Sequence, residues 1–236
     1  MTLDLDTLVL RSGTHTSPSD GVSLMEAVSD FAGEPWSNSP RSTSPVIAAY
    51  ARSLNDWLAD DERQRLKAYI PRLVGTAEPD LELRRAFACA DASVRVFAPL
   101  AFKAAGLVEE AARLGVLAPV DRASAESARS AAESAESAAR AAASLSAWSA
   151  AESMRSAADS ARSAARSASS AARSAQAESA AESARSAESA QAAARSAARS
   201  AESAQAAASS AAQAAASSTA RAAAFKLLDR LIAAAS

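Results

Sequence analysis

From Asp121 to its last residue the chain contains neither glycine nor proline, and it is written almost entirely in alanine, serine, arginine and glutamate. Glycine and proline are the residues that most often interrupt regular structure, and alanine is the best helix former. The segment therefore predicts one very long helix, or a few helices joined without ordinary turn residues. It contains no histidine, cysteine or tyrosine, so we expect no catalytic group in it.

A seven-residue rhythm runs through this segment. Serines recur at spacings of 3 and 4, as at Ser127, Ser130 and Ser134, and later at spacings of 7, as at Ser196 and Ser203. The mean spacing of about 3.5 is the coiled-coil period. Arginine and glutamate follow the same rhythm on another face, which leaves two faces of small residues. We expect a heptad-like, coiled-coil packing of the alanine-coil kind, with a lone long helix or a solvated low-complexity spacer as alternatives.

Large apolar side chains return only at the end of the chain. They are Phe225, Leu227, Leu228, Leu231 and Ile232. Such a face needs a surface to bury against, so these residues are the candidates for docking or self-association. Either the repeat doubles back and the tail docks on its own chain, or the tail docks on another subunit of a homo-oligomer. Insertion into a membrane surface ranks lower, because the polar face has few basic residues and Asp229 offsets them.

The first half predicts a small helical bundle, so the expected fold class is all-α. Helices are expected from a cap at Ser19 or Asp20 to about residue 31, and from a cap at Ser44 with Pro45 in the first turn to about residue 58. Further helices are expected over 60–73, ended by Pro71, over 80–97, broken or kinked at Pro99, and over 100–114, ended by Gly115. The predicted organisation is a flexible arm over 1–19 with room for one short strand, a helical domain over 20–119, the repeat over 120–220 and an amphipathic helix end over 221–236.

Part of the first half resembles a known module. The matching stretches are DGVSLMEAV (20–28), AGEPWS (32–37), SPVIAA (44–49), RSLND (52–56) and IPRLVGT (70–76). Together they resemble a module of uncharacterised actinobacterial and actinophage proteins, and they cover about a quarter of the chain. The resemblance brings no assigned activity. It implies that Ser23, Ser42 and Ser44 stand where relatives carry cysteines, so a metal or redox role there would be absent from this chain.

No arrangement of residues points to catalysis, so we expect no enzyme, no catalytic or metal-binding residues and no cofactor. Seven carboxylates lie between residues 26 and 62, but they fall at expected caps or exposed positions, and no histidine or cysteine is expected to converge on them. They are Glu26, Asp30, Glu34, Asp56, Asp60, Asp61 and Glu62. Cys89 and His15 are single residues of their kind, and Cys89 is expected to be a buried thiol. Trp36 and Trp148 are the candidate exposed aromatic residues, with Trp36 as a loop plug over the core as the alternative.

Charge and hydropathy limit the classes of partner that we expect for this chain. The formal net charge of -2 is the sum of -4 over residues 1–119 and +2 over residues 120–236, and neither half is basic enough to predict nucleic-acid binding. No apolar run long enough to span a membrane and no secretory signal is recognisable, so a cytoplasmic location is expected, without a small-molecule ligand. The favoured function is a structural scaffold with a helical head and an alanine-rich stalk that self-associates. The alternatives are an ice-binding or hydrated-surface-binding helical protein, and an enzyme or ligand-binding module in the head without a recognisable motif.

Overall fold

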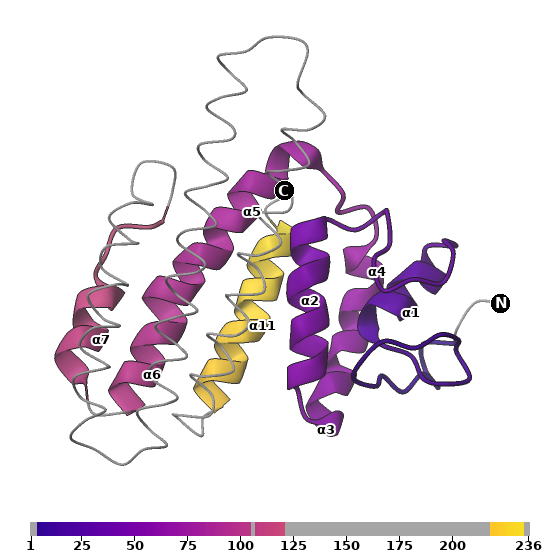
Figure 1. Cartoon of the computed structure of the whole chain (residues 1–236), viewed down its shortest axis with the longest axis horizontal. Helices are drawn as coiled ribbons and strands as arrows, with labels where there is room; N and C mark the ends of the chain where they lie inside the picture. The colour runs from indigo at the N-terminus through magenta and orange to yellow at the C-terminus, as the bar shows by residue number, and fades with distance from the viewer. Residues whose placement is uncertain (1–3, 105–106, 121–217, 234–236) are drawn as a thin grey trace, which may run out of the picture.

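The computed structural model describes residues 4–104, 107–120 and 218–233, and Figure 1 shows how they are arranged. Within these ranges all regular structure is helical and no strand occurs, which confirms the predicted all-α class. The repeat predicted over 120–220 lies almost wholly outside the described residues. The C-terminal helix, drawn in yellow, lies beside helices of the first half, so the described residues share one core.

The first helix, α1 (Leu24–Phe31), begins later than predicted. Its cap is Ser23 and not Ser19 or Asp20. The carboxylate of Glu26, at the third helical position, accepts the Ser23 backbone N–H at 2.8 Å and so satisfies a donor that the helix itself leaves open. Gly33, with φ of +69°, takes the left-handed conformation that ends the helix, as predicted.

The second helix, α2 (Pro45–Trp57), begins as the sequence predicts. The Ser44 hydroxyl accepts the Ile47 N–H at 3.2 Å, and Pro45 occupies the first turn, where its missing N–H costs nothing. Its apolar stripe faces inward, so that Tyr50 and Leu54 are fully buried.

The third segment is not the continuous helix predicted over 60–73. It consists of α3 (Asp60–Arg63), a 3-10 segment (Gln64–Tyr69) and α4 (Ile70–Leu73). Pro71 has no N–H to give to the carbonyl of Lys67, and Ile70 donates to that carbonyl instead, in the tighter 3-10 pattern. Pro71 therefore occupies the first turn of a new helix, where the sequence predicted a terminator.

The next helix also differs from its prediction at a proline. Helix α5 (Pro79–Ala92) continues through a π-helical turn (Ser93–Phe97) into α6 (Ala98–Ala104), so Pro99 does not break it. A widened turn directly before a proline relaxes the hydrogen-bond ladder that the proline cannot join. Helix α7 (Val108–Gly115) follows as a separate helix that pairs with α6, and Gly115 is its last residue rather than the residue beyond it.

The N-terminal residues 4–19 are not an arm detached from the bundle. Leu8 and Leu10 are buried in the core. The Gln64 side chain accepts the Leu10 N–H at 2.9 Å and donates to the Leu10 carbonyl at 3.0 Å, while the Lys67 ammonium donates to the Leu8 carbonyl at 3.1 Å. These contacts replace the strand that the alternating leucines permitted, and they correct the predicted domain boundary after residue 19.

Candidate functional site

The five C-terminal residues predicted to dock all lie against the core of the same chain. They belong to helix α11 (Ser218–Ala233), which packs on α2, α5 and the π-helical turn. Phe225, Leu227, Leu228 and Leu231 are buried, with Leu228 and Leu231 at 0% exposure, and Ile232 packs against the core while partly exposed. We call α11 the tail, and the surface of the first half that receives it the tail site.

Two buried polar side chains of the tail site reach backbone carbonyls of the tail. The Tyr50 hydroxyl donates to the Ala224 carbonyl at 3.0 Å, and burial raises the pKa of Tyr50 well above its ordinary value, so this phenol keeps its proton. The Arg85 Nε donates to the Leu231 carbonyl at 3.2 Å, in the last turn of the tail, where carbonyls lack helical partners. These bonds fix how far the tail is shifted along the tail site, which apolar contacts alone would leave loose.

Arg85 is itself fully buried and held in place by polar groups of the first half. Its Nη1 donates to the Glu82 carboxylate at 2.7 Å and to the Thr76 carbonyl at 2.8 Å. A buried guanidinium requires such partners, because an unpaired buried charge is costly. The tail therefore meets a preformed, charged contact and not a purely apolar surface.

Ion pairs surround this apolar centre. Arg72 Nη2 lies 2.9 Å from Asp229 Oδ1, and Arg221 Nε lies 2.9 Å from Glu62 Oε1. In both pairs each partner keeps a substantial exposed fraction, so each pair stabilises the tail only modestly. The two pairs have opposite polarity. The tail site provides the cation in the Arg72–Asp229 pair, and the tail provides it in the Arg221–Glu62 pair.

Phe225 is the aromatic contact of the tail. Its ring centroid lies 6.1 Å from that of Tyr69, and the guanidinium carbon of Arg65 lies 4.3 Å from its centroid. Tilted aromatic pairs and a cation over a ring both add to the free energy of plain apolar burial. Such an arrangement, with apolar and aromatic centre and charged rim, is typical of a protein–protein interface.

Asp91 bonds to residues on both sides of the repeat. Its Oδ1 accepts the Val120 N–H at 3.1 Å and the Arg95 guanidinium at 2.8 Å, while its Oδ2 accepts the Arg230 guanidinium at 3.0 Å. Burial alone would raise the pKa of Asp91, but the hydrogen bonds from Arg230, Arg95 and Val120 outweigh it and hold the pKa below its ordinary value. One ionised carboxylate thus contacts the last described residue before the repeat and the helix that follows it.

A second polar cluster pins the N-terminal residues onto α1. Glu26 is fully buried and accepts the His15 backbone N–H at 2.6 Å and the His15 Nδ1 at 2.9 Å. Burial tends to raise the pKa of Glu26, yet the N–H groups of His15 and Ser23 outweigh it and lower that pKa, so the carboxylate is ionised. Nδ1 of His15 is therefore assigned as the proton donor. The prediction that no histidine approaches the carboxylates is wrong, because His15 folds back across the loop onto α1.

Gly21 makes this cluster possible. Its φ of +145° is open to glycine and rarely to other residues, and a Cβ placed there would lie 2.5 Å from Cδ2 and Nε2 of the His15 ring. The same point is 3.1 Å from the Arg11 Cδ, so the two side chains converge on the glycine. The resembling stretch that begins at residue 20 therefore contains the glycine that admits the histidine and the glutamate that holds it.

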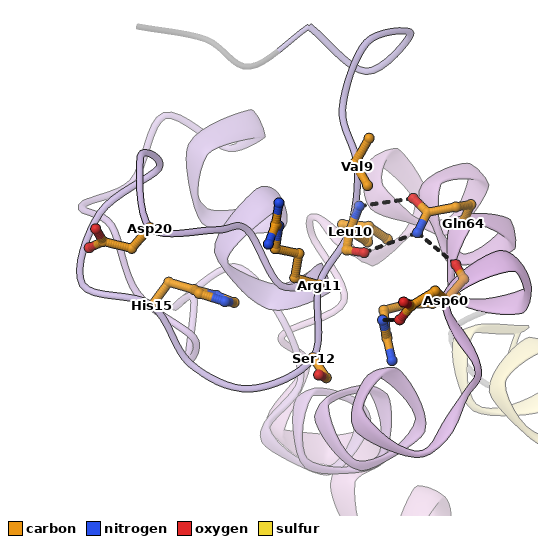
Figure 2. Close-up of a pocket in the computed structure, with 9 residues that line it drawn as sticks. Val9, Leu10, Arg11, Ser12, His15, Asp20, Asp60 and Gln64 are labelled. Atoms are coloured by element: carbon orange, nitrogen blue, oxygen red, sulfur yellow. Dashed lines mark hydrogen bonds and ion pairs between the residues drawn. The ribbon is translucent and has the colours of Figure 1, made fainter.

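An open hollow of about 460 Å³ lies beside His15 (Figure 2). Figure 2 shows the N-terminal loop with His15 and Asp20 on one side and Gln64 and Asp60 on the other. Several polar groups of the hollow already have partners within the protein: Gln64 bonds the Leu10 backbone, and Asp20 accepts from the Thr16 and Ser17 hydroxyls. No group of three or more possible metal ligands occurs among the described residues.

Two of the other carboxylates singled out from the sequence support loops. Glu34 accepts the backbone N–H groups of Arg41 and Ser42 at 2.6 and 2.8 Å, and Asp56 accepts the Gly13 N–H at 2.7 Å. These bonds hold the loops on either side of α1. The structure gives these two carboxylates a role in loop geometry.

The aromatic, serine and cysteine candidates are distributed as follows. Trp36 is half-buried against the core and its Nε1 donates to the His15 carbonyl at 3.0 Å, whereas Trp148 lies outside the described residues. Ser23 and Ser44 cap α1 and α2. Burial raises the pKa of the Cys89 thiol well above its usual range, which favours the inert protonated form.

Sequence reasoning found the tail but missed its polar partners, Asp91, Arg85 and Tyr50. The sequence around Tyr50 indicates no target for its hydroxyl. Asp91 does carry a signal, because it is a single charge inside the run ACADASV of α5, where a buried carboxylate needs partners.

Comparison with known proteins leaves the resemblance a prediction. No family model, no curated protein and no solved structure matches this chain. Among the helices of the described ranges, none is long and apolar enough to cross a membrane.

Proposed function

We propose that this protein is a non-enzymatic scaffold whose helical head holds both ends of the Ala/Ser repeat and presents the repeat for self-association. The observation that carries the proposal is the Asp91 carboxylate, which bonds Val120 before the repeat and Arg230 after it. Because one buried carboxylate bonds residues on both sides of the repeat, we infer that the repeat leaves the head and returns to it.

The position of the tail supports the same proposal. The apolar face that needed a partner is covered by the head of its own chain, and the alanine and serine faces of the repeat are the surface we assign to association. Such faces bury little apolar area per residue, and association through them depends on length and close approach of helices. We expect association that is weak per heptad and adds up along the repeat.

The test is sedimentation of the full chain over a wide concentration range. We expect the mean mass to rise with concentration, and the double variant Ser196→Glu with Ser203→Glu to weaken association, because both positions share the small-residue face of the heptad. The matched control is Ala192→Glu with Ala206→Glu, which adds the same charge at the heptad position of Arg199 on the charged face. A mass that stays monomeric at all concentrations contradicts the proposal, as does equal weakening by both pairs.

A further inference from the structure

We propose that the tail site also accepts the tail of a second copy of this chain, so that two chains exchange residues 218–233. This inference rests on the proposed function, in which the chain associates with itself, and it assigns the tail site as a second route of association. Tail exchange reproduces every contact of the closed chain, because the same residues meet in both arrangements.

The first observation is the length of the segment that joins the head to the tail. Residues 121–217 separate Val120 from Ser218, so no short turn forces the tail onto its own head. Docking on the same chain is favoured because the tail is held at a high effective concentration near its own head. When the connection is flexible, that effective concentration falls as the connecting segment becomes longer. A helix at the end of a long connecting segment is thus better suited to exchange than one joined by a tight loop.

The tail site itself is the second observation. The tail is recognised by features that act between separate molecules: a buried apolar centre at Leu228 and Leu231, an aromatic contact at Phe225, and charged pairs at the rim. Tyr50 and Arg85 add bonds to backbone carbonyls, which specify the register of the incoming helix. The partner that fits is therefore a helix with this sequence of charges and apolar residues, and a second copy supplies it.

The two rim pairs allow a direct test, because their signs can be exchanged. The head variant carries Glu62→Arg and Arg72→Asp, and the tail variant carries Arg221→Glu and Asp229→Arg. Each variant keeps the net charge of the parent chain and places like charges at both rim positions when its tail docks on its own head. In a mixed pair with exchanged tails, each head meets a tail of opposite sign at both positions.

The experiment unfolds the two variants together in urea, refolds them, and counts mixed and like pairs by native mass spectrometry with one chain isotopically labelled. Random pairing of equal amounts gives as many mixed as like pairs, and we expect the ratio of mixed to like pairs to rise at least about tenfold above that, since two surface pairs are restored at each of two tail sites. The chain with all four substitutions restores both pairs within itself, and it is the control that the substitutions permit folding. Random proportions of mixed and like pairs overturn the inference.

Failure here and failure of the proposed function give different results. If the parent chain associates, Ser196→Glu with Ser203→Glu weakens it, and the mixture stays random, then the repeat associates and the tails do not exchange. If mixed pairs dominate while those two serine substitutions have no effect, then tail exchange stands and association through the repeat is wrong.

Discussion

Leu228→Ala is the sharpest test of how the chain closes. Leu228 is 0% exposed and belongs to the core shared by the tail, α2 and α5. Truncating a fully buried leucine removes its transfer free energy and leaves a cavity, and such changes cost about 2–5 kcal/mol. That is a large share of the roughly 5–15 kcal/mol that stabilises a typical domain. Because the tail shares this core, we expect the tail and the head to unfold together, at a lower urea concentration than in the parent chain.

The measurement is urea unfolding of the full chain followed by circular dichroism. With a slope of about 2 kcal/mol per molar urea, a loss of about 3 kcal/mol lowers the midpoint by about 1.5 M. Lys226→Ala is the matched control, since Lys226 lies two residues earlier on the exposed side of the same helix, and its removal should change stability by less than about 0.5 kcal/mol. Equal midpoints for Leu228→Ala and the parent chain would refute the reasoning, because a tail outside the core has no cavity to leave.

Two further predictions concern the polar clusters. Gly21→Ala should destabilise the protein by about 1–3 kcal/mol more than Gly13→Ala in thermal unfolding. Both glycines have positive φ, but only at Gly21 would the new Cβ meet the His15 ring. Equal losses of stability would argue against the close approach of His15 to Gly21. The pKa of Asp91 in the folded protein lies below its ordinary value, because the hydrogen bonds from Arg230, Arg95 and Val120 outweigh burial. The ionised carboxylate therefore contributes its full stabilisation above the pKa of the unfolded chain. That stabilisation is lost as the pH falls through the pKa of the folded protein. The parent chain should therefore lose more stability than Asp91→Asn between about pH 5 and pH 2, and parallel acid profiles in unfolding titrations would contradict this.

Local residue patterns predicted those features that depend on neighbours in the sequence. The start of α2 follows from Ser44 and Pro45, whose side chains and backbone act within one turn. The prediction at Ser19 or Asp20 failed because several capping residues precede α1, and the choice of Ser23 depends on where the Glu26 carboxylate reaches. The predicted end at Pro71 and the predicted break at Pro99 failed for a similar reason, since a 3-10 segment or a π-helical turn lets a helical path continue past a residue without an N–H.

The His15 cluster shows what sequence patterns leave out. Nothing in the spacing of His15 and Glu26 indicates that a loop returns to lay one on the other, and the clearance comes from Gly21, whose role needs three-dimensional proximity. The same holds for the N-terminal residues, whose leucines read as a weak strand and lie instead on the bundle through Gln64 and Lys67. Long-range hydrogen bonds of this kind join residues that share no local pattern.

By itself the sequence determined that the chain is helical, that its first half holds a core, and that the apolar face from Phe225 to Ile232 must be buried. It left open which surface would bury that face, because the hydrophobic effect is proportional to area and carries no direction. The tertiary structure decided it through groups that do have direction: the Tyr50 hydroxyl, the Arg85 guanidinium and the Asp91 carboxylate select one surface of the head and one register of the tail.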